Sequence, residues 1–250
     1  MNEFYFNSLA WAWILFALLL VPFQILIPAP YGRHTRANWG LQVDNRLGWM
    51  LMEVISPIVF TFFFLQGSAE KTSGSWVLFA LWTLHYVHRS LIFPWRTNTK
   101  GKKIPLLIVT SAVFFNMANG FLNGYYLGEM QAPTLFIDHP RFIVGGLVFL
   151  LGAALNFRAD THLLRLRKPG DTGYKIPYHP VFRRVSCPNH LGEIIEWTGF
   201  AIMAWNIAAV SFAVWTAANL IPRALNHHRW YKRQFEDYPE ERRAVIPYIL

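Results

Sequence analysis

Residues 7–28 read NSLAWAWILFALLLVPFQILIP, a stretch of 22 residues without a charged side chain. A helix needs about 20 mostly apolar residues to cross the hydrocarbon core of a bilayer, so this stretch is predicted to be a membrane-spanning helix. The whole chain has the same character. Hydrophobic residues make up 54% of its 250 residues and charged residues only 15%, against about 25% charged residues in ordinary soluble domains. This composition excludes a soluble enzyme and a disordered chain, and the single cysteine excludes a disulfide scaffold.

Further apolar runs predict the other helices. They lie at residues 47–65, 74–93, 104–127, 142–157 and 191–222. The last run is too long for one crossing and has Asn206 near its middle, so we expect a tight hairpin of two helices there. The predicted fold class is therefore all-α, a polytopic membrane protein with seven transmembrane helices. No strand-like alternation or internal repeat argues for a membrane β-barrel.

The charges of the connecting segments predict the orientation. Lys and Arg gather in segments 29–46, 94–103 and 158–190 and in the tail from Arg223, whereas the alternate segments are poor in both. Cytoplasmic loops carry an excess of Lys and Arg, so the N-terminus is predicted outside and the C-terminus in the cytoplasm. The net charge of +9 is then a property of these loops, and we expect no nucleic-acid partner.

Polar side chains within the predicted helices lie near the cytoplasmic ends. In chain order they are Glu53 in the second helix, Tyr86 and Arg89 in the third, Asn156 at the end of the fifth, and Glu193 and Glu196 at the start of the sixth. Ionisable residues at membrane depth are costly and usually functional. We therefore expect a polar cavity open to the cytoplasm.

Three spacings place polar side chains on single helix faces. They are Asn156, Asp160 and Arg167; Asn189, Glu193 and Glu196; and Arg223, His227 and Tyr231. A carboxylate and an arginine on one stripe suit ribose hydroxyls and a phosphate. The basic stripes equally suit lipid headgroups. Asn189 equally suits an N-cap, with Glu193 as a first-turn acid favoured by the helix dipole.

Glu53 and Tyr86 suggest a second kind of site. A tyrosine hydroxyl held by a neighbouring acid can polarise a carbonyl oxygen. The alternatives are a Glu53 carboxylate that reaches the interface and an interfacial belt formed by the aromatic and cationic residues of 84–90. The chain lacks both a G-x-G-x-x-G segment after a strand and a P-loop, so any nucleotide must be bound by helices and a basic loop. One cysteine and no H-E-x-x-H motif argue against a zinc site, and no metal is expected.

Six segments together resemble the steroid 5α-reductases, the 3-oxo-5α-steroid 4-dehydrogenases. They are YGRHT (31–35), LHYVHRS (84–90), NGFLNGYYL (119–127), LRLRKPGDTGYKIP (164–177), NHLGEIIEW (189–197) and HHRWYKRQFEDYPEERRAVIP (227–247). The similarity covers nearly the whole chain in order. It implies a seven-helix membrane reductase that uses NADPH to saturate the 4,5 double bond of 3-oxo-Δ4-steroids, with hydride transfer to C5.

The resemblance also implies roles for individual residues. Glu53 and Tyr86 match the pair that grips the steroid 3-oxo group. The NADPH-contacting positions are matched by Asn156, Asp160, Arg167, Asn189, Arg223, His227 and Tyr231. Positions that line the same cavity are matched by Tyr31, Arg89, Tyr174, Glu193 and Glu196, and all of these but Glu196 are assigned to the cofactor. The chain would be one reductase domain over residues 1–250, with the steroid pocket mainly from helices one to four and the NADPH pocket mainly from residues 142–250.

Other functions stay open at this point. A membrane methyltransferase of the isoprenylcysteine carboxyl type also has a helical nucleotide pocket, but it needs no buried Tyr–Glu pair. A transporter with a cytoplasmic cavity usually shows internal repeats and broken helices. A reductase of another lipid enone is the remaining alternative. In each case we expect an integral membrane protein, of the bacterial inner membrane or the endoplasmic reticulum, in contact with lipid and without an obligate protein partner.

Overall fold

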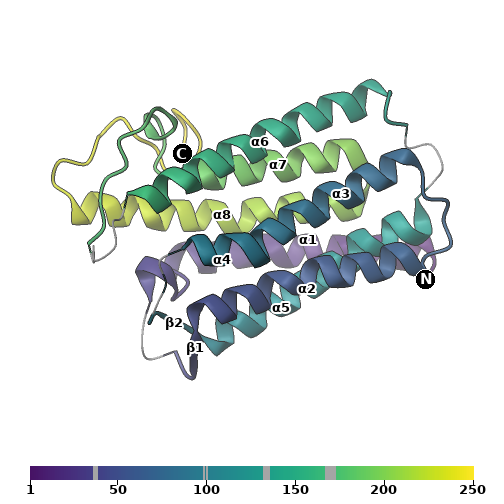
Figure 1. Cartoon of the computed structure of the whole chain (residues 1–250), viewed down its shortest axis with the longest axis horizontal. Helices are drawn as coiled ribbons and strands as arrows, with labels where there is room; N and C mark the ends of the chain where they lie inside the picture. The colour runs from purple at the N-terminus through teal and green to yellow at the C-terminus, as the bar shows by residue number, and fades with distance from the viewer. Residues whose placement is uncertain (36–38, 98, 100, 132–135, 167–172) are drawn as a thin grey trace. The chain divides into compact units, whose positions relative to one another are not determined.

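The structure is a computed structural model of the 250-residue chain, and it describes all residues except 36–38, 98, 100, 132–135 and 167–172. Helices follow the apolar runs in order (Figure 1). They are α1 (Glu3–Leu26), α2 (Asn45–Gln66), α3 (Ser73–Val87), α4 (Phe93–Arg96), α5 (Leu106–Tyr125), α6 (Pro140–Arg165), α7 (Pro188–Ala204) and α8 (Ile207–Gln234). The prediction of a mostly helical chain is confirmed.

The long run at 191–222 is interrupted at the predicted place. Trp205 ends α7 in the left-handed region, with φ 49°. Asn206 then caps α8, because its side-chain oxygen accepts a hydrogen bond from the Ala209 N–H at 2.9 Å. Such a cap satisfies one of the N–H groups that the first turn of a helix leaves unpaired. The helical hairpin is therefore confirmed.

Five helical segments of the described chain are long and apolar enough to cross a membrane. They are Glu3–Leu26, Asn45–Gln66, Leu106–Met130, Pro140–Arg165 and Ile207–Gln234. The other long helices are shorter, since α3 has 15 residues and α7 has 17. A π-helical turn, His88–Ile92, extends α3 into α4. The helices are those of an all-α membrane protein, while seven crossings and their orientation remain predictions.

A small antiparallel ribbon was not expected from the sequence. It pairs β1 (Gln42–Asp44) with β2 (Lys103–Pro105), and Val43 lies opposite Ile104. Each strand leads directly into a helix, β1 into α2 and β2 into α5. The ribbon provides backbone hydrogen bonds for the two connecting segments that lead into α2 and α5. Three-residue strands carry too few residues to show an alternating pattern, which explains why the sequence did not predict them.

The contacts within the described chain divide it into two compact units. Unit 1 comprises Met1–Ala10, Ala29–Ile143 and Asn206–Ala209. Unit 2 comprises Trp11–Pro28, Val144–Trp205 and Val210–Leu250. Unit 1 therefore contains α2 to α5, and unit 2 contains α7 with most of α1, α6 and α8.

In unit 1, a glycine stripe lets α5 approach α2 closely. Gly120, Gly124 and Gly128 recur every four residues and therefore share one face of the helical segment. A Cβ at Gly124 would overlap the backbone of Phe60, and one at Gly128 would overlap that of Phe63. Small residues at this spacing are a common way for membrane helices to pack by backbone contact. This packing sets the distance between the two helices that carry Glu53 and Asn116.

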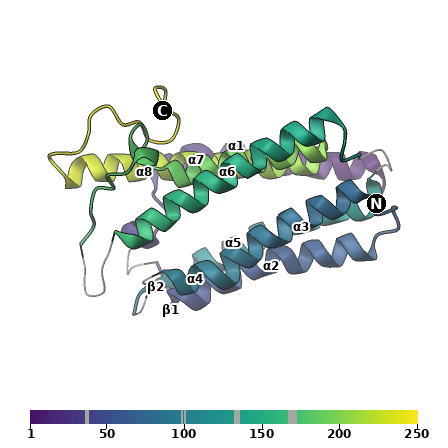
Figure 2. The same cartoon turned by 45° about the horizontal axis from the view of Figure 1, so that its top comes forward.

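In unit 2, glycines on both helices bring α6 and α7 together, and Figure 2 shows the two helices side by side. Gly145 and Gly152 on α6 and Gly192 and Gly199 on α7 are each seven residues apart. A Cβ at any of the four would overlap backbone atoms of the other helix. Seven residues are about two turns, so each helix offers two contact points on one face. The polar side chains next to the contact of Gly152 with Gly192 are thereby held at short range.

Candidate active site

The Tyr86 hydroxyl is held inside unit 1 by an amide. Tyr86 is only 4% exposed, and its hydroxyl donates to Asn116 Oδ1 at 3.3 Å. Asn116 Nδ2 in turn donates to the Met52 carbonyl at 2.7 Å. These bonds connect α3, α5 and α2, and they place Glu53, the residue after Met52, at the level of the Tyr86 hydroxyl. Glu53 is half-buried.

Asn116 is a residue that the sequence analysis missed. It is 3% exposed and makes both side-chain bonds of this network. The available signal was a carboxamide inside the apolar run 104–127, where a buried amide must find partners. It went unused because Asn116 belongs to none of the helix-face spacings that were considered.

Arg89 lies in the π-helical turn His88–Ile92, which begins two residues after Tyr86. Its guanidinium carbon is 5.3 Å from the centre of the Trp49 ring and 4.7 Å from that of the Phe93 ring. The Trp49 indole N–H also donates to the Arg89 carbonyl at 3.2 Å. Cations are attracted to the faces of aromatic rings, so these two rings orient the arginine. π-turns of this kind are frequent at functional sites.

Tyr31 also belongs to unit 1. It is half-buried and packs against a small apolar cluster of Met52, Ile104 and Val109. Met52 belongs both to this cluster and, through its carbonyl, to the Tyr86–Asn116 network. The structure thus gathers the candidates Tyr31, Glu53, Tyr86 and Arg89 around the cytoplasmic ends predicted for α2 and α3.

In unit 2, four candidate residues form a polar cluster between α6 and α7. Asn156 Nδ2 donates to the Asn189 carbonyl at 3.0 Å and to Glu193 Oε2 at 3.3 Å. Asn189 Nδ2 donates to Asp160 Oδ1 at 3.0 Å. Asn156 and Asp160 are nearly buried, with 6% and 5% exposure, and Glu196 further along α7 is 3% exposed. The predicted faces of both helices therefore meet, and the glycine contacts explain the short range.

Two sequence-based expectations about this cluster are wrong. Asn156 does not close its helix, because α6 continues nine residues further to Arg165; the helix follows its hydrogen bonds past the point where the apolar run ends. Asn189 is not an N-cap, because α7 begins at Pro188 and the capping position is Cys187. Proline favours the first helical position, and this leaves the Asn189 side chain available for Asp160.

Arg223, His227 and Tyr231 all lie within α8, as predicted. His227 is 8% exposed, and its ring is 5.6 Å from that of His190 on α7. Tyr231 is 3% exposed and stacks on Tyr238 with ring centres 5.1 Å apart. Arg223 is half-buried two turns before Tyr231.

Residues 177–178, in the second half of the basic segment 158–190, are held by the C-terminal tail. Arg242 is 4% exposed, donates from Nη2 to the Pro177 carbonyl at 3.0 Å and lies over the Tyr178 and Tyr238 rings. Tyr174, a candidate, packs edge-on against Trp230 of α8 with ring centres 4.9 Å apart. The sequence analysis did not single out Arg242.

A second set of hydrogen bonds, centred on Ser186, joins this tail to the residues before α7. Ser186 Oγ is 2.7 Å from both His228 Nδ1 and the Tyr238 hydroxyl, and it donates to the Arg243 carbonyl. Burial raises the pKa of the Tyr238 phenol, and the hydrogen bond with Ser186 partly opposes that rise. The phenol therefore stays protonated at neutral pH and can act as a donor.

Arg167 lies outside the described residues. Within the part of the chain that the structure describes, no group of three or more His, Cys, Asp or Glu side chains is arranged to hold a metal ion. The described candidates instead form amide, carboxylate, phenol and guanidinium clusters on helices, which is a set of groups suited to binding an organic cofactor and a carbonyl substrate.

Comparison with known proteins agrees with a site for an organic cofactor and a carbonyl substrate. Residues 102–250 match the profile of the 3-oxo-5-alpha-steroid 4-dehydrogenase family. A cotton (Gossypium hirsutum) protein named steroid 5-alpha-reductase DET2 is 40% identical over 233 residues, which are 89% of each chain. Human 3-oxo-5-alpha-steroid 4-dehydrogenase 1 is 38% identical over 223 residues, 88% of this chain and 86% of its own.

These matches define the class of protein first: the chain is a helical membrane oxidoreductase of the type that acts on CH–CH bonds. It belongs to the 3-oxo-5-alpha-steroid 4-dehydrogenase family.

Proposed function

We propose that the chain uses NADPH to reduce the 4,5 double bond of 3-oxo-Δ4-steroids. The observation that carries this proposal is the similarity to steroid reductases over 89% and 88% of the chain. The buried Tyr86 hydroxyl, which Asn116 links to the Met52 carbonyl next to Glu53, supports the same reaction from the structural side.

In the proposed reaction, NADPH supplies a hydride to C5 when it is bound. Negative charge then grows on the 3-oxo oxygen, and the Tyr86 hydroxyl donates a hydrogen bond to it. A proton added at C4 converts this enolate into the saturated 3-ketone, and the oxidised cofactor leaves as NADP⁺. A preorganised donor in a water-poor site stabilises such charge far better than a donor in water does. Glu53, at the level of that hydroxyl, supports Tyr86 or holds the ketone directly. The remaining task of the protein is to align the reactants and exclude water.

The residues of unit 2 fit a nicotinamide nucleotide. A carboxylate oxygen accepts more than one hydrogen bond, so Asp160 and Glu193 can receive ribose hydroxyls in addition to the amides that contact them. Asn156 donates with both hydrogens of its amide, which leaves its oxygen as an acceptor for a carboxamide. Arg223, together with Arg167, supplies positive charge for phosphates, and His227 supplies a hydrogen-bonding imidazole.

We place both sites in one reductase domain over residues 1–250, with seven crossings and a cavity open to the cytoplasm. Five of the helices meet the length and apolarity of a membrane span, and the alternation of Lys and Arg supports the orientation. The steroid, being apolar, would enter from the lipid that surrounds the helices.

The test of the activity is turnover by the purified full chain in detergent. We expect NADPH oxidation that depends on testosterone or progesterone and yields the 5α-reduced steroid, identified by mass and by its stereochemistry. If NADPH were oxidised only with a different lipid enone, that lipid class and not the steroids would be the substrate. Tight binding of S-adenosylmethionine without NADPH turnover would support the methyltransferase alternative.

The test of the cofactor assignment is NADPH affinity in single variants. Asp160→Ala and His227→Ala lie on different helices, α6 and α8, and only a shared ligand makes both matter. We expect each to weaken NADPH binding at least about tenfold, since each removes a charged or polar contact. His139→Ala, an exposed histidine before α6, is the control. Unchanged affinity in both variants would contradict the assignment.

A further inference from the structure

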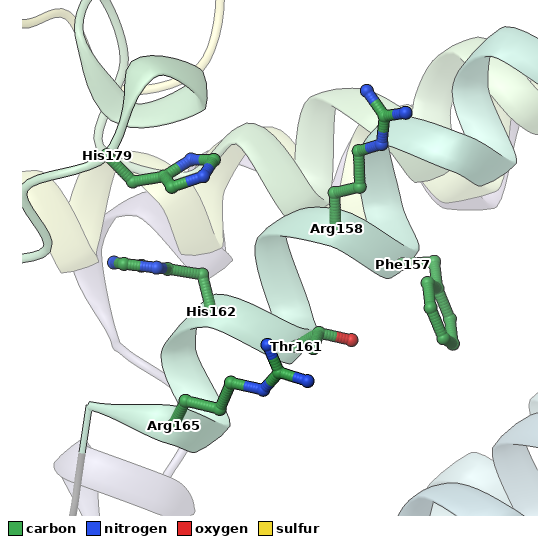
Figure 3. Close-up of a pocket in the computed structure, with 6 residues that line it drawn as sticks. All are labelled: Phe157, Arg158, Thr161, His162, Arg165 and His179. Carbon is green, nitrogen blue, oxygen red and sulfur yellow. The ribbon is translucent and has the colours of Figure 1, made fainter.

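A cationic hollow lies on α6, apart from the candidate active site. It encloses about 350 Å³. The described residues that line it are Phe157, Arg158, Thr161, His162, Arg165 and His179. Figure 3 shows five of these side chains leaving α6, while His179 reaches in from the segment that follows. None of the described lining residues is acidic.

The hollow faces away from the proposed cofactor. At 100° per residue, Arg158 and Arg165 lie about 160–180° around α6 from Asn156. Asn156 and Asp160 face α7 and are nearly buried, whereas both arginines are exposed. The hollow is therefore separate from the polar cluster between α6 and α7.

The position of the hollow along α6 matches the depth of lipid headgroups. Residues 142–157 contain no charged side chain, and Arg141 and Arg158 flank them. Sixteen helical residues span about 24 Å, which is most of the roughly 30 Å hydrocarbon thickness of a bilayer. Several apolar side chains on the exposed surface are open to the surroundings, among them Leu147 at 58%, Leu150 at 59% and Leu151 at 70%. Phe157, at 50%, is the last of them before Arg158.

Two histidines add hydrogen-bond donors to the positive charge. Their rings, on His162 and His179, are 4.7 Å apart, and His162 points toward His179 in Figure 3. His179 Nδ1 accepts a hydrogen bond from the Val181 N–H, so a neutral His179 carries its proton on Nε2 and can donate from there. His162 Nε2 is buried without a hydrogen-bond partner among the described residues.

We propose that this hollow binds the phosphate headgroup of an anionic phospholipid, with the acyl chains along the apolar exposed surface of α6. Arg158 and Arg165 supply the charge, and His179 supplies a directed donor, Nε2, to a phosphate oxygen. Basic pockets at the ends of membrane helices recognise anionic headgroups in this way. The lipid-facing leucines that precede the arginines favour a lipid over a free anion, because only a lipid has chains to cover them.

The experiment compares lipid retention by matched double variants of the full chain. The variant of the hollow, called the hollow variant, is Arg158→Gln with Arg165→Gln. The control is Arg183→Gln with Arg233→Gln, which removes the same charge from exposed arginines elsewhere. Native mass spectrometry from a neutral detergent would measure retained phosphatidylglycerol, phosphatidylcholine or inorganic phosphate. Thermal unfolding would verify that both variants are folded.

We expect the wild-type chain and the control to retain phosphatidylglycerol in preference to phosphatidylcholine. We expect the hollow variant to bind phosphatidylglycerol about 30-fold more weakly, from about fivefold per arginine. A phosphatidylglycerol with a photoreactive group near its phosphate should label the peptide that contains residues 157–165. Equal retention of phosphatidylglycerol by the hollow variant and the control would overturn the proposal. So would equal retention of the zwitterionic lipid, binding of inorganic phosphate alone, or labelling confined to other peptides.

Discussion

The Tyr86 hydroxyl has a single proton, and in the structure that proton is directed to Asn116 Oδ1 at 3.3 Å. This is long for a bond between two oxygens, whose usual separation is about 2.7–2.8 Å. The bond is therefore weak, and the hydroxyl can turn toward a steroid ketone at little cost. Asn116 holds the donor in place without competing strongly for its proton.

The first residue-scale prediction concerns Tyr86→Phe. The change keeps the buried ring and removes only the hydroxyl, so we expect kcat to fall about 10²–10³-fold, as for loss of one oxyanion donor. NADPH affinity should stay within about twofold, because the change alters no residue assigned to the cofactor and most of those residues lie in unit 2. Glu53→Gln should be milder, since an amide can still form a hydrogen bond. Near-normal turnover of an enone steroid by Tyr86→Phe would return Tyr86 to a packing role.

The second residue-scale prediction concerns Asn116→Leu. This variant removes the hydrogen bonds that the Asn116 amide makes with the Tyr86 hydroxyl and the Met52 carbonyl, and each such bond contributes about 0.5–1.5 kcal/mol. We expect kcat to fall about tenfold and NADPH affinity to be unchanged. Asn119→Leu is the matched control, because that buried amide donates to Phe115 within its own helix. Equal losses of kcat in the two variants would show that Asn116 has no special role.

At the element scale, helix positions were predictable and helix ends were not. Apolar runs report where a helix is covered by lipid or core, and they located α1 to α3 and α5 to α8 along with the break at Asn206, but not the short α4. They say nothing about a helix that continues into polar surroundings, so the last nine residues of α6 and the π-turn after Tyr86 were missed. The proline at 188 decided the start of α7 over the asparagine that follows it.

The candidate residues were likewise predictable as faces but not as contacts. Spacing placed Asn156 with Asp160, and Asn189 with Glu193. Their meeting depends on the close approach of α6 and α7, which the glycines at 145, 152, 192 and 199 permit. A spacing of seven residues on both helices was present in the sequence, but it becomes informative only once the partner helix is known.

The element-scale prediction tests this glycine contact. Gly152→Ala would drive a methyl group into the α7 backbone near Gly192 and Glu196, and such overpacking costs about 1–3 kcal/mol or more. We expect a lower midpoint of thermal unfolding and weaker NADPH binding, because Asn156 would move away from Glu193. Gly146→Ala is the matched control, since its Cβ would be 3.7 Å from the Met203 sulfur and meet no backbone. A Gly152→Ala variant as stable as this control would refute the contact.

At the scale of the whole molecule, the orientation of the chain in the membrane decides which compartment supplies the cofactor. Segment 94–103 carries Arg96, Lys100, Lys102 and Lys103 without an acid, whereas the preceding connection, between α2 and α3, carries only Glu70 and Lys71. If the positive-inside rule applies, these two connections lie on opposite sides of the membrane. Segment 94–103 would then face the cytoplasm and its NADPH pool, and the connection between α2 and α3 would face the outer side.

The chain offers a direct measurement of this orientation, because its single cysteine, Cys187, is buried and only 4% exposed. Glu70→Cys and Lys102→Cys each add one exposed thiol, on opposite sides of the predicted topology. In sealed cells, a membrane-impermeant maleimide should label Glu70→Cys at once and Lys102→Cys only after permeabilisation, while the unmodified chain is the background control. The reverse pattern would invert the topology. Labelling of both from outside would mean that α3 does not cross, and would leave the cavity without the cytoplasmic end on which Tyr86 and Arg89 are placed.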